Sequence, residues 1–253
     1  MITALALFSM FFGAGNLIFP PMLAVQAGEN FWPAILGFLT TGALLPVLAV
    51  VAIALSGSNV RDLAQRAGTL FGVAFPVLAY LSIGAFYALP RTGAVSFEVA
   101  VTPLFGWDST VSKVIFNIVF FGIALALSWN PTRITDTLGK FLTPALVTLL
   151  VIMIGMAIFT MTNQHYAPSE DFATNAYPSG VLEGYLTMDS IAALAFSIVV
   201  IASLRNKGFA EGKPLVRSTI LAGLGASVLL ALIYLGLGPV SYTHLRAHET
   251  EAD

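Results

Sequence analysis

Long apolar stretches recur along the chain, separated by short polar segments. A helix needs about 20 apolar residues to cross the ~30 Å hydrocarbon core of a bilayer. The pattern therefore predicts an all-α polytopic membrane protein with about seven transmembrane helices. The predicted helices are residues 2–25, 32–55, 70–100, 111–129, 138–161, 181–204 and 215–237.

The positive charges in the connecting segments predict the orientation. Eight Lys and Arg residues lie in the connections after the second, fourth and sixth apolar stretches, and one, Lys113, lies in the others. Cytoplasmic loops carry the excess of Lys and Arg. We therefore expect a multi-pass protein of the cell membrane with a cytoplasmic N-terminus.

Composition agrees with a membrane protein and narrows its chemistry. The chain is 57% hydrophobic and 9% charged, with a mean hydropathy of +0.88, whereas a soluble domain is about one-quarter charged. Because there is no cysteine, disulfides and thiolate metal sites are excluded. Residues 241–253 turn abruptly polar after the seventh stretch, so we expect a non-native tail on a C-terminally truncated chain.

The first apolar stretch contains residues that disfavour a helix. Gly13-Ala14-Gly15-Asn16 lies in its middle, and Pro20 and Pro21 follow. Glycine weakens a helix and proline donates no amide hydrogen. Irregular backbone at membrane depth persists only where it is buried in protein or lines a polar cavity. The pattern predicts a helix break at a ligand site, and the alternative is a packing kink.

The sixth stretch carries an acidic residue within apolar sequence. Asp189 is flanked by the hydroxyl residues Thr187 and Ser190. Ionisable residues inside membrane helices are costly and usually mark a substrate or ion pathway. The alternative is a carboxylate at a helix end near the membrane surface.

The third stretch is also interrupted, by Pro90, Arg91 and Glu98. A spacing of seven residues places Arg91 and Glu98 on one helical face, two turns apart. This spacing suits a bridging network more than a direct contact, and the alternative is two charges near the membrane surface. Tyr87 and Phe86 are candidates for a pocket wall.

Three motifs resemble the bacterial branched-chain amino acid:cation symporter family. They are Phe-Phe-Gly-Ala-Gly-Asn-Leu-Ile-Phe-Pro-Pro (11–21), Leu-Pro-Arg-Thr-Gly-Ala-Val-Ser-Phe-Glu (89–98) and Gly-Tyr-Leu-Thr-Met-Asp (184–189). The resemblance covers residues 1 to about 240. It implies a LeuT-type inverted-repeat fold in which helices 1 and 6 are discontinuous. It assigns residues 1–161 to the first five-helix repeat, 162–178 to an extracellular loop, and 179–240 to the first two helices of an incomplete second repeat.

The resemblance also implies the site. Backbone carbonyls of Ala14 and Leu17 would supply half of a Na⁺ site. Structural breaks would lie at Gly13, Pro20, Pro21, Pro90, Arg91 and Glu98. The substrate-binding residues would be Phe12, Ala14, Gly15, Asn16, Phe86, Tyr185, Thr187, Asp189 and Ser190.

The implied function is secondary active transport of leucine, isoleucine and valine into the cell by alternating access, coupled to Na⁺ or H⁺. No catalysis, organic cofactor or nucleic acid is expected; the partners are the substrate and the lipid bilayer. We expect this chain alone to be inactive. The alternatives are an H⁺-coupled amino acid permease of other specificity and a membrane-embedded enzyme. The enzyme is disfavoured because neither paired aspartates nor HExxH occurs. The coupling ion, the preferred substrate and the oligomeric state stay open.

Overall fold

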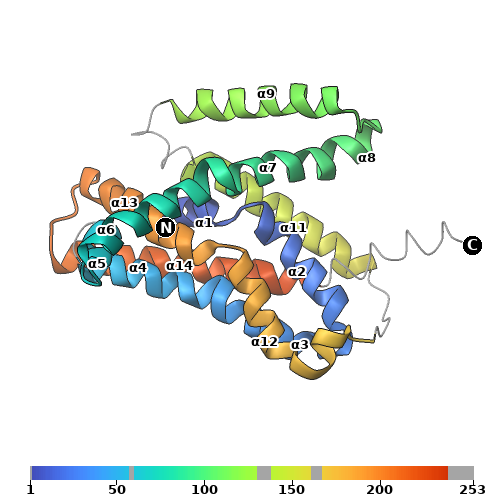
Figure 1. Ribbon diagram of the computed structural model, residues 1–253, viewed down its shortest axis with the longest axis horizontal. Coiled ribbons are helices and arrows are strands. Elements are labelled where there is room, and N and C mark those ends of the chain that lie inside the picture. The colour runs from blue at the N-terminus through green and yellow to red at the C-terminus, as the bar shows by residue number, and fades with distance from the viewer. Residues whose placement is uncertain (1, 57–59, 130–137, 161–166, 239–253) are drawn as a thin grey trace, which may run out of the picture.

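The computed structural model describes residues 2–56, 60–129, 138–160 and 167–238, and these are helical with short connections (Figure 1). No strand occurs in these ranges. The α-helices are α1 (Ile2–Phe11), α2 (Ala14–Ala27), α3 (Phe31–Leu39), α4 (Leu45–Ser56), α5 (Val60–Gln65), α6 (Thr69–Leu81), α7 (Ala88–Ser96), α8 (Thr102–Phe105), α9 (Thr110–Ser128), α11 (Thr143–Thr160), α12 (Glu170–Leu186), α13 (Asp189–Asn206) and α14 (Lys213–Leu237).

Five shorter helical segments join some of these helices without a loop. A 3₁₀ turn, η1 (Gly28–Asn30), connects α2 to α3. The other four are single π-helical turns, η2 (Thr40–Leu44), η3 (Ser82–Phe86), η4 (Phe97–Val101) and η5 (Leu138–Leu142).

The described residues contain six helical stretches that are long and apolar enough to cross a membrane, together with the shorter apolar helix α1. The sequence predicted seven helices, and the difference arises at the start of the chain. The connection expected near residue 28 is itself helical, so Ala14–Ser56 forms one stretch of 43 residues. At 1.5 Å per residue this is about 65 Å, roughly twice a ~30 Å hydrocarbon core. Gly28 bends the stretch with a φ of +50°, a conformation that glycine adopts readily.

The interior of the molecule is built from α1, α4, α13 and α14, which contact one another. Their apolar side chains form a continuous core that includes Phe8, Val50, Val200 and Leu230, each fully buried. The α1–α2 interruption follows one of these helices and the α12–α13 interruption precedes another.

The tightest helix pair is α3 with α12. Added Cβ atoms at Gly37, Gly180 and Gly184 would overlap backbone atoms of the opposite helix. Small residues let membrane helices approach closely. The hydroxyl of Thr41 also donates to the Val181 carbonyl at 2.7 Å, so packing and hydrogen bonding hold the pair together.

In contrast, α9 lies at the edge of the molecule, beyond α7 (Figure 1). It has no buried residue, and its apolar side chains such as Ile118 and Leu125 are more than 60% exposed. A helix with an apolar surface all round requires lipid or further protein around it.

The predicted loop at 162–178 is partly helical in the structure. Residues 161–166 lie outside the described part, and α12 begins at Glu170. Pro178 lies inside this helix, and Asn175 has a non-helical backbone (φ −131°, ψ 43°). The described part of this range therefore contains a distorted helix packed on α3, and its assignment to an extracellular loop stays a prediction. The tail at 241–253 also lies outside the described residues, and the division into repeats stays a prediction.

Candidate functional site

The first interruption of helical structure lies between α1 and α2. Hydrogen bonding in α1 ends with the amide of Phe12, which donates to Phe8 at 2.8 Å. Gly13 is extended (φ −109°, ψ −170°), and α2 begins at Ala14. The amide of Gly13 donates to Asn16 Oδ1 at 3.0 Å, so the first turn of α2 is capped by its own side chain. The last carbonyls of α1 have no partner within the helix.

Pro20 and Pro21 do not break the backbone, which corrects one prediction. Both lie inside α2. A proline in a helix cannot donate to the carbonyl four residues earlier, so these two remove the helical donors of the Asn16 and Leu17 carbonyls. The prediction of Leu17 as a cation ligand gains a physical basis here. Ala14 lies half-buried at the start of α2, and its carbonyl keeps a possible helical donor at residue 18.

The second interruption lies between α12 and α13, at Thr187 and Met188. Met188 has a φ of +64° and is alone among the described non-glycine residues in the left-handed region, a conformation that costs free energy for a residue with a Cβ. The buried hydroxyl of Thr187 donates to the Gly184 carbonyl at 2.8 Å. Asp189 begins α13, where a carboxylate interacts favourably with the helix dipole.

Three buried polar side chains join these two interruptions. Asn16 Nδ2 donates to Asp189 Oδ2 at 2.6 Å and also to the Tyr234 hydroxyl. The Tyr234 hydroxyl in turn donates to Asp189 Oδ2 at 2.7 Å. Relative exposures are 1% for Asn16, 1% for Asp189 and 0% for Tyr234. We call these three residues the polar triad. It links α2, α13 and α14 in a closed, mutually hydrogen-bonded cluster, as buried polar groups require.

Some other predicted site residues lie beside the triad. Gly15 is buried and Ala14 is half-buried. Ser190 is also buried, and its hydroxyl is one of two described buried side-chain groups without a hydrogen-bond partner. Phe12 is half-buried, and its ring stacks on Phe8 with centroids 5.3 Å apart.

Two predicted pocket residues are not brought to the triad. Tyr185 is 51% exposed on α12, and Phe86 is 75% exposed in η3. Both face outward because of where their helices turn, which a linear pattern of aromatic residues does not reveal.

Pro90 and Arg91 lie in α7, and Glu98 lies in η4. The third interruption is therefore earlier than predicted, at Gly84 and Tyr87, whose backbones are non-helical. In the described part of the chain Arg91 and Glu98 form no ion pair. The Arg91 guanidinium instead packs between Phe19 of α2 and Tyr87.

Sequence reasoning missed Tyr234. A signal for it exists in α14, where the buried residues Thr219, Gly223, Ser227 and Leu230 precede it at helical spacing. Small and polar residues on one face of an apolar helix indicate a protein-facing side, and Tyr234 continues that face.

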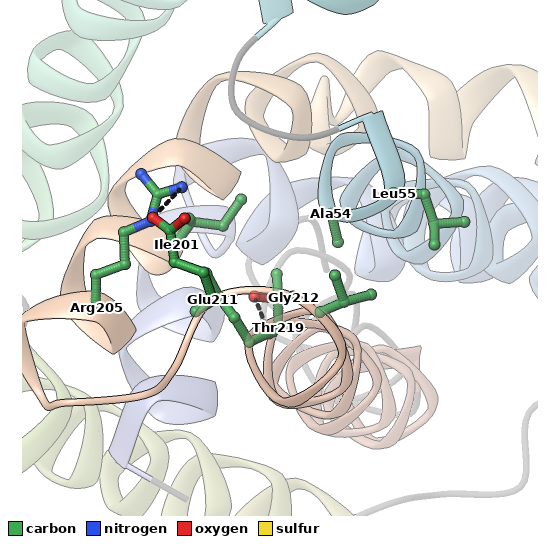
Figure 2. A pocket seen from close by; sticks show the side chains of 9 residues that line it. Ala54, Leu55, Ile201, Arg205, Glu211, Gly212 and Thr219 are labelled. Carbon is green, nitrogen blue, oxygen red and sulfur yellow. Dashed lines mark hydrogen bonds and ion pairs between the residues drawn. The ribbon is translucent and has the colours of Figure 1, made fainter.

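A separate cavity of about 200 Å³ lies at the other end of α13. Figure 2 shows Glu211 reaching toward Arg205 at its rim, and their charged atoms are 3.5 Å apart. Ala54, Leu55 and Leu215 make most of its wall apolar. Because Arg205 lies 16 residues after Asp189, or roughly 24 Å along a helix, this cavity is distinct from the triad.

In the described part of the chain, no three His, Cys, Asp or Glu residues gather to hold a metal ion. A cation near the triad would therefore depend on neutral oxygen ligands together with Asp189. Carbonyl oxygens, amide oxygens and hydroxyls are suitable ligands for hard cations.

Comparison with known proteins adds a family. The model of the family described as branched-chain amino acid transport protein matches residues 1–252. Similar curated proteins include the branched-chain amino acid permease BrnQ of Corynebacterium glutamicum, 55% identical over 95% of this chain and 55% of that protein. The BrnQ permease of Bacillus subtilis is 44% identical over 94% of this chain and 54% of its own length. This chain thus spans about half the length of these relatives. No solved structure matches it.

Proposed function

Because the chain belongs to the branched-chain amino acid transport protein family, we propose that it forms part of a carrier whose substrate binds where the α1–α2 and α12–α13 interruptions meet. The family consists of transport proteins, which argues against the membrane-embedded enzyme considered above. The relatives' names as branched-chain amino acid permeases support leucine, isoleucine and valine as substrates.

The polar triad is the observation that carries this proposal. Two helices lose their regular backbone, and a buried amide, carboxylate and hydroxyl join them. Polar groups placed so deeply in a membrane protein are costly and typically serve a transport pathway. The triad has almost no exposed surface, so we interpret the arrangement as a closed state that must open to admit a ligand.

The finer mechanism is also a proposal. We propose a LeuT-type fold that works by alternating access. It is supported by the positions of the two interruptions, in the first and sixth of the predicted helices, because corresponding interruptions in two halves indicate the binding site of an inverted-repeat transporter. The coupling ion in this proposal is Na⁺ or H⁺. The Leu17 carbonyl and Asn16 suit Na⁺, whereas the buried Asp189 suits H⁺.

The direct test is uptake of radiolabelled leucine by a chimera. Residues 1–238 of this chain replace the matching segment of the Corynebacterium glutamicum permease, in cells that lack branched-chain amino acid uptake. We expect Asn16→Ala and Asp189→Asn each to reduce uptake by roughly tenfold or more, since the first removes a buried hydrogen bond and the second removes the charge of its acceptor.

Two control variants make the same kinds of substitution at residues outside the polar triad. Asn117→Ala alters an amide on α9 that bonds only to its own helix, and Asp108→Asn alters an exposed carboxylate paired with Lys113. Both should transport normally. Unchanged uptake by the two triad variants, at equal expression, would refute the site.

Replacing Na⁺ with choline in the same assay decides the coupling ion. Loss of uptake without Na⁺ supports the sodium symporter. Uptake that persists without Na⁺ and collapses when the pH gradient is removed supports the H⁺-coupled alternative.

A further inference from the structure

Arg91 is a charged residue in a membrane-spanning stretch, and its contacts leave its charge without a counterion. It lies within the apolar stretch Thr69–Phe105 and is half-buried. In the described part of the chain no carboxylate lies within ion-pair distance of it. Its single hydrogen bond, from Nη1 to the Tyr87 hydroxyl, is long at 3.4 Å. A membrane-embedded cation normally pairs with an anion or a cluster of acceptors.

Two aromatic rings hold the guanidinium in place. Its central carbon is 5.5 Å from the centroid of Phe19 and 5.2 Å from that of Tyr87. The guanidinium lies over the faces of both rings, where a cation is attracted, and these contacts use none of its five N–H donors. The side chain is thus held in place while most of its donors stay unused.

The guanidinium lies directly against the first interruption. A Cβ atom on Gly15 would overlap Arg91 Nη2, so a larger residue at position 15 would displace the guanidinium. Gly15 precedes Asn16 of the polar triad, and Arg91 also interacts electrostatically with Asp189. Arg91 therefore extends the site from the closed triad to a half-exposed position that a ligand can reach.

We propose that Arg91 binds the carboxylate of the amino acid substrate. A guanidinium presents parallel N–H groups that match the two oxygens of a carboxylate. The inference rests on the proposed transport function for the identity of the substrate, and it adds a residue and a chemical role that neither the motif nor the family match assigns. Gly15 is the positioning residue, because its missing side chain leaves room for the guanidinium.

The test measures equilibrium binding by microscale thermophoresis to the purified chimera described above, reconstituted in lipid nanodiscs. Three probes distinguish recognition of the carboxylate from recognition of the ammonium group. L-leucine carries both charges, 4-methylpentanoate carries only the carboxylate, and 3-methylbutylamine carries only the ammonium. The chimera without substitutions is compared with Arg91→Gln and Arg91→Lys. The control is Arg205→Gln, which removes a guanidinium at the far end of α13.

We expect Arg91→Gln to weaken binding of leucine and 4-methylpentanoate by roughly 10- to 100-fold, which corresponds to the loss of a charge-assisted hydrogen bond. Binding of 3-methylbutylamine should stay unchanged. Arg91→Lys keeps the charge without the paired donors and should give a smaller loss for the same two probes. Arg205→Gln should bind all three probes as the chimera without substitutions does.

The outcomes separate this inference from the proposed function. Equal weakening of all three probes by both Arg91 variants would show a structural role and overturn the inference. Unchanged leucine binding in these variants would overturn it while leaving the transport function intact. Arg91-dependent binding of 4-methylpentanoate without leucine binding would support the carboxylate site and count against the function. A chimera without substitutions that binds neither L-leucine nor 4-methylpentanoate would overturn both.

Discussion

The helix α3, which packs on α12, and the peripheral helix α9 are both apolar, yet they differ in burial. Four of the nine residues of α3 are buried, Ala34, Ile35, Gly37 and Phe38, whereas α9 has no buried residue. The difference in burial comes from small and hydroxyl-bearing residues at the helix contact. The α3–α12 contact contains Gly37, Gly180 and Gly184 and a hydroxyl that bonds across the helices. In lipid, apolar side chains gain little by leaving one apolar environment for another, so close packing and hydrogen bonds decide which helices associate.

The largest loss of stability is expected when Gly180 of α12 receives a side chain. In Gly180→Ala the new Cβ would overlap the Ala34 carbonyl, and we expect destabilisation at the upper end of the about 1–3 kcal/mol typical of overpacking. Gly122→Ala in α9, where a Cβ meets nothing, should be neutral or stabilising because alanine favours helix. Unfolding in mixed detergent and SDS micelles measures both. Equal losses would mean that the α3–α12 contact is not specific.

A cavity in the core should have the next largest effect. Leu230→Ala on α14 removes a fully buried side chain, and we expect a loss near the low end of the about 2–5 kcal/mol seen in soluble cores, because lipid replaces water as the reference. Leu125→Ala on α9 removes a side chain that is 61% exposed and should change little. The same unfolding measurement applies, and a large effect at Leu125 would show that α9 packs against protein.

A smaller loss of stability is expected when one hydroxyl is removed from the polar triad. Tyr234→Phe deletes a donor to Asp189 and an acceptor for Asn16, for an expected cost of about 1–3 kcal/mol because buried partners are left unsatisfied. Tyr80→Phe changes a tyrosine on α6 that is 48% exposed and should be nearly silent. A melting temperature that falls equally in both variants would contradict the buried network.

The smallest effect is expected for one hydrogen bond between helices. Thr41→Val removes the bond to Val181 and should cost about 0.6 kcal/mol, the average for such bonds in a membrane protein. Thr92→Val removes a hydroxyl that bonds only to Ala88 of its own helix and should cost less. A cost for Thr92→Val equal to that for Thr41→Val would show that the cross-helix bond adds nothing.

Sequence patterns predicted the helical membrane class well because apolar length is a local property. They also singled out Asn16 and Asp189, since a polar residue in an apolar stretch is visible without a structure. The hydrogen bond between these residues could not be predicted from the sequence, because it depends on how α2, α13 and α14 pack. Tyr234 was missed for the same reason.

Two sets of predictions depended on more than residue type. Pro20 and Pro21 were expected to break the backbone, and they remain helical within α2. Phe86 and Tyr185 were expected to face a substrate, and they are largely exposed. The two prolines remove backbone donors without ending the helix, and the direction of an aromatic side chain depends on helix rotation and on neighbours distant in sequence.

The triad also has a consequence for synthesis of the protein. Asn16 is 173 residues from Asp189 and 218 from Tyr234. At about 5–20 residues per second, Asn16 enters the membrane on the order of ten to tens of seconds before its partners exist. Throughout that interval its amide depends on water or on the insertion machinery. The helix α2 therefore cannot form its full set of triad hydrogen bonds until α14 has been translated.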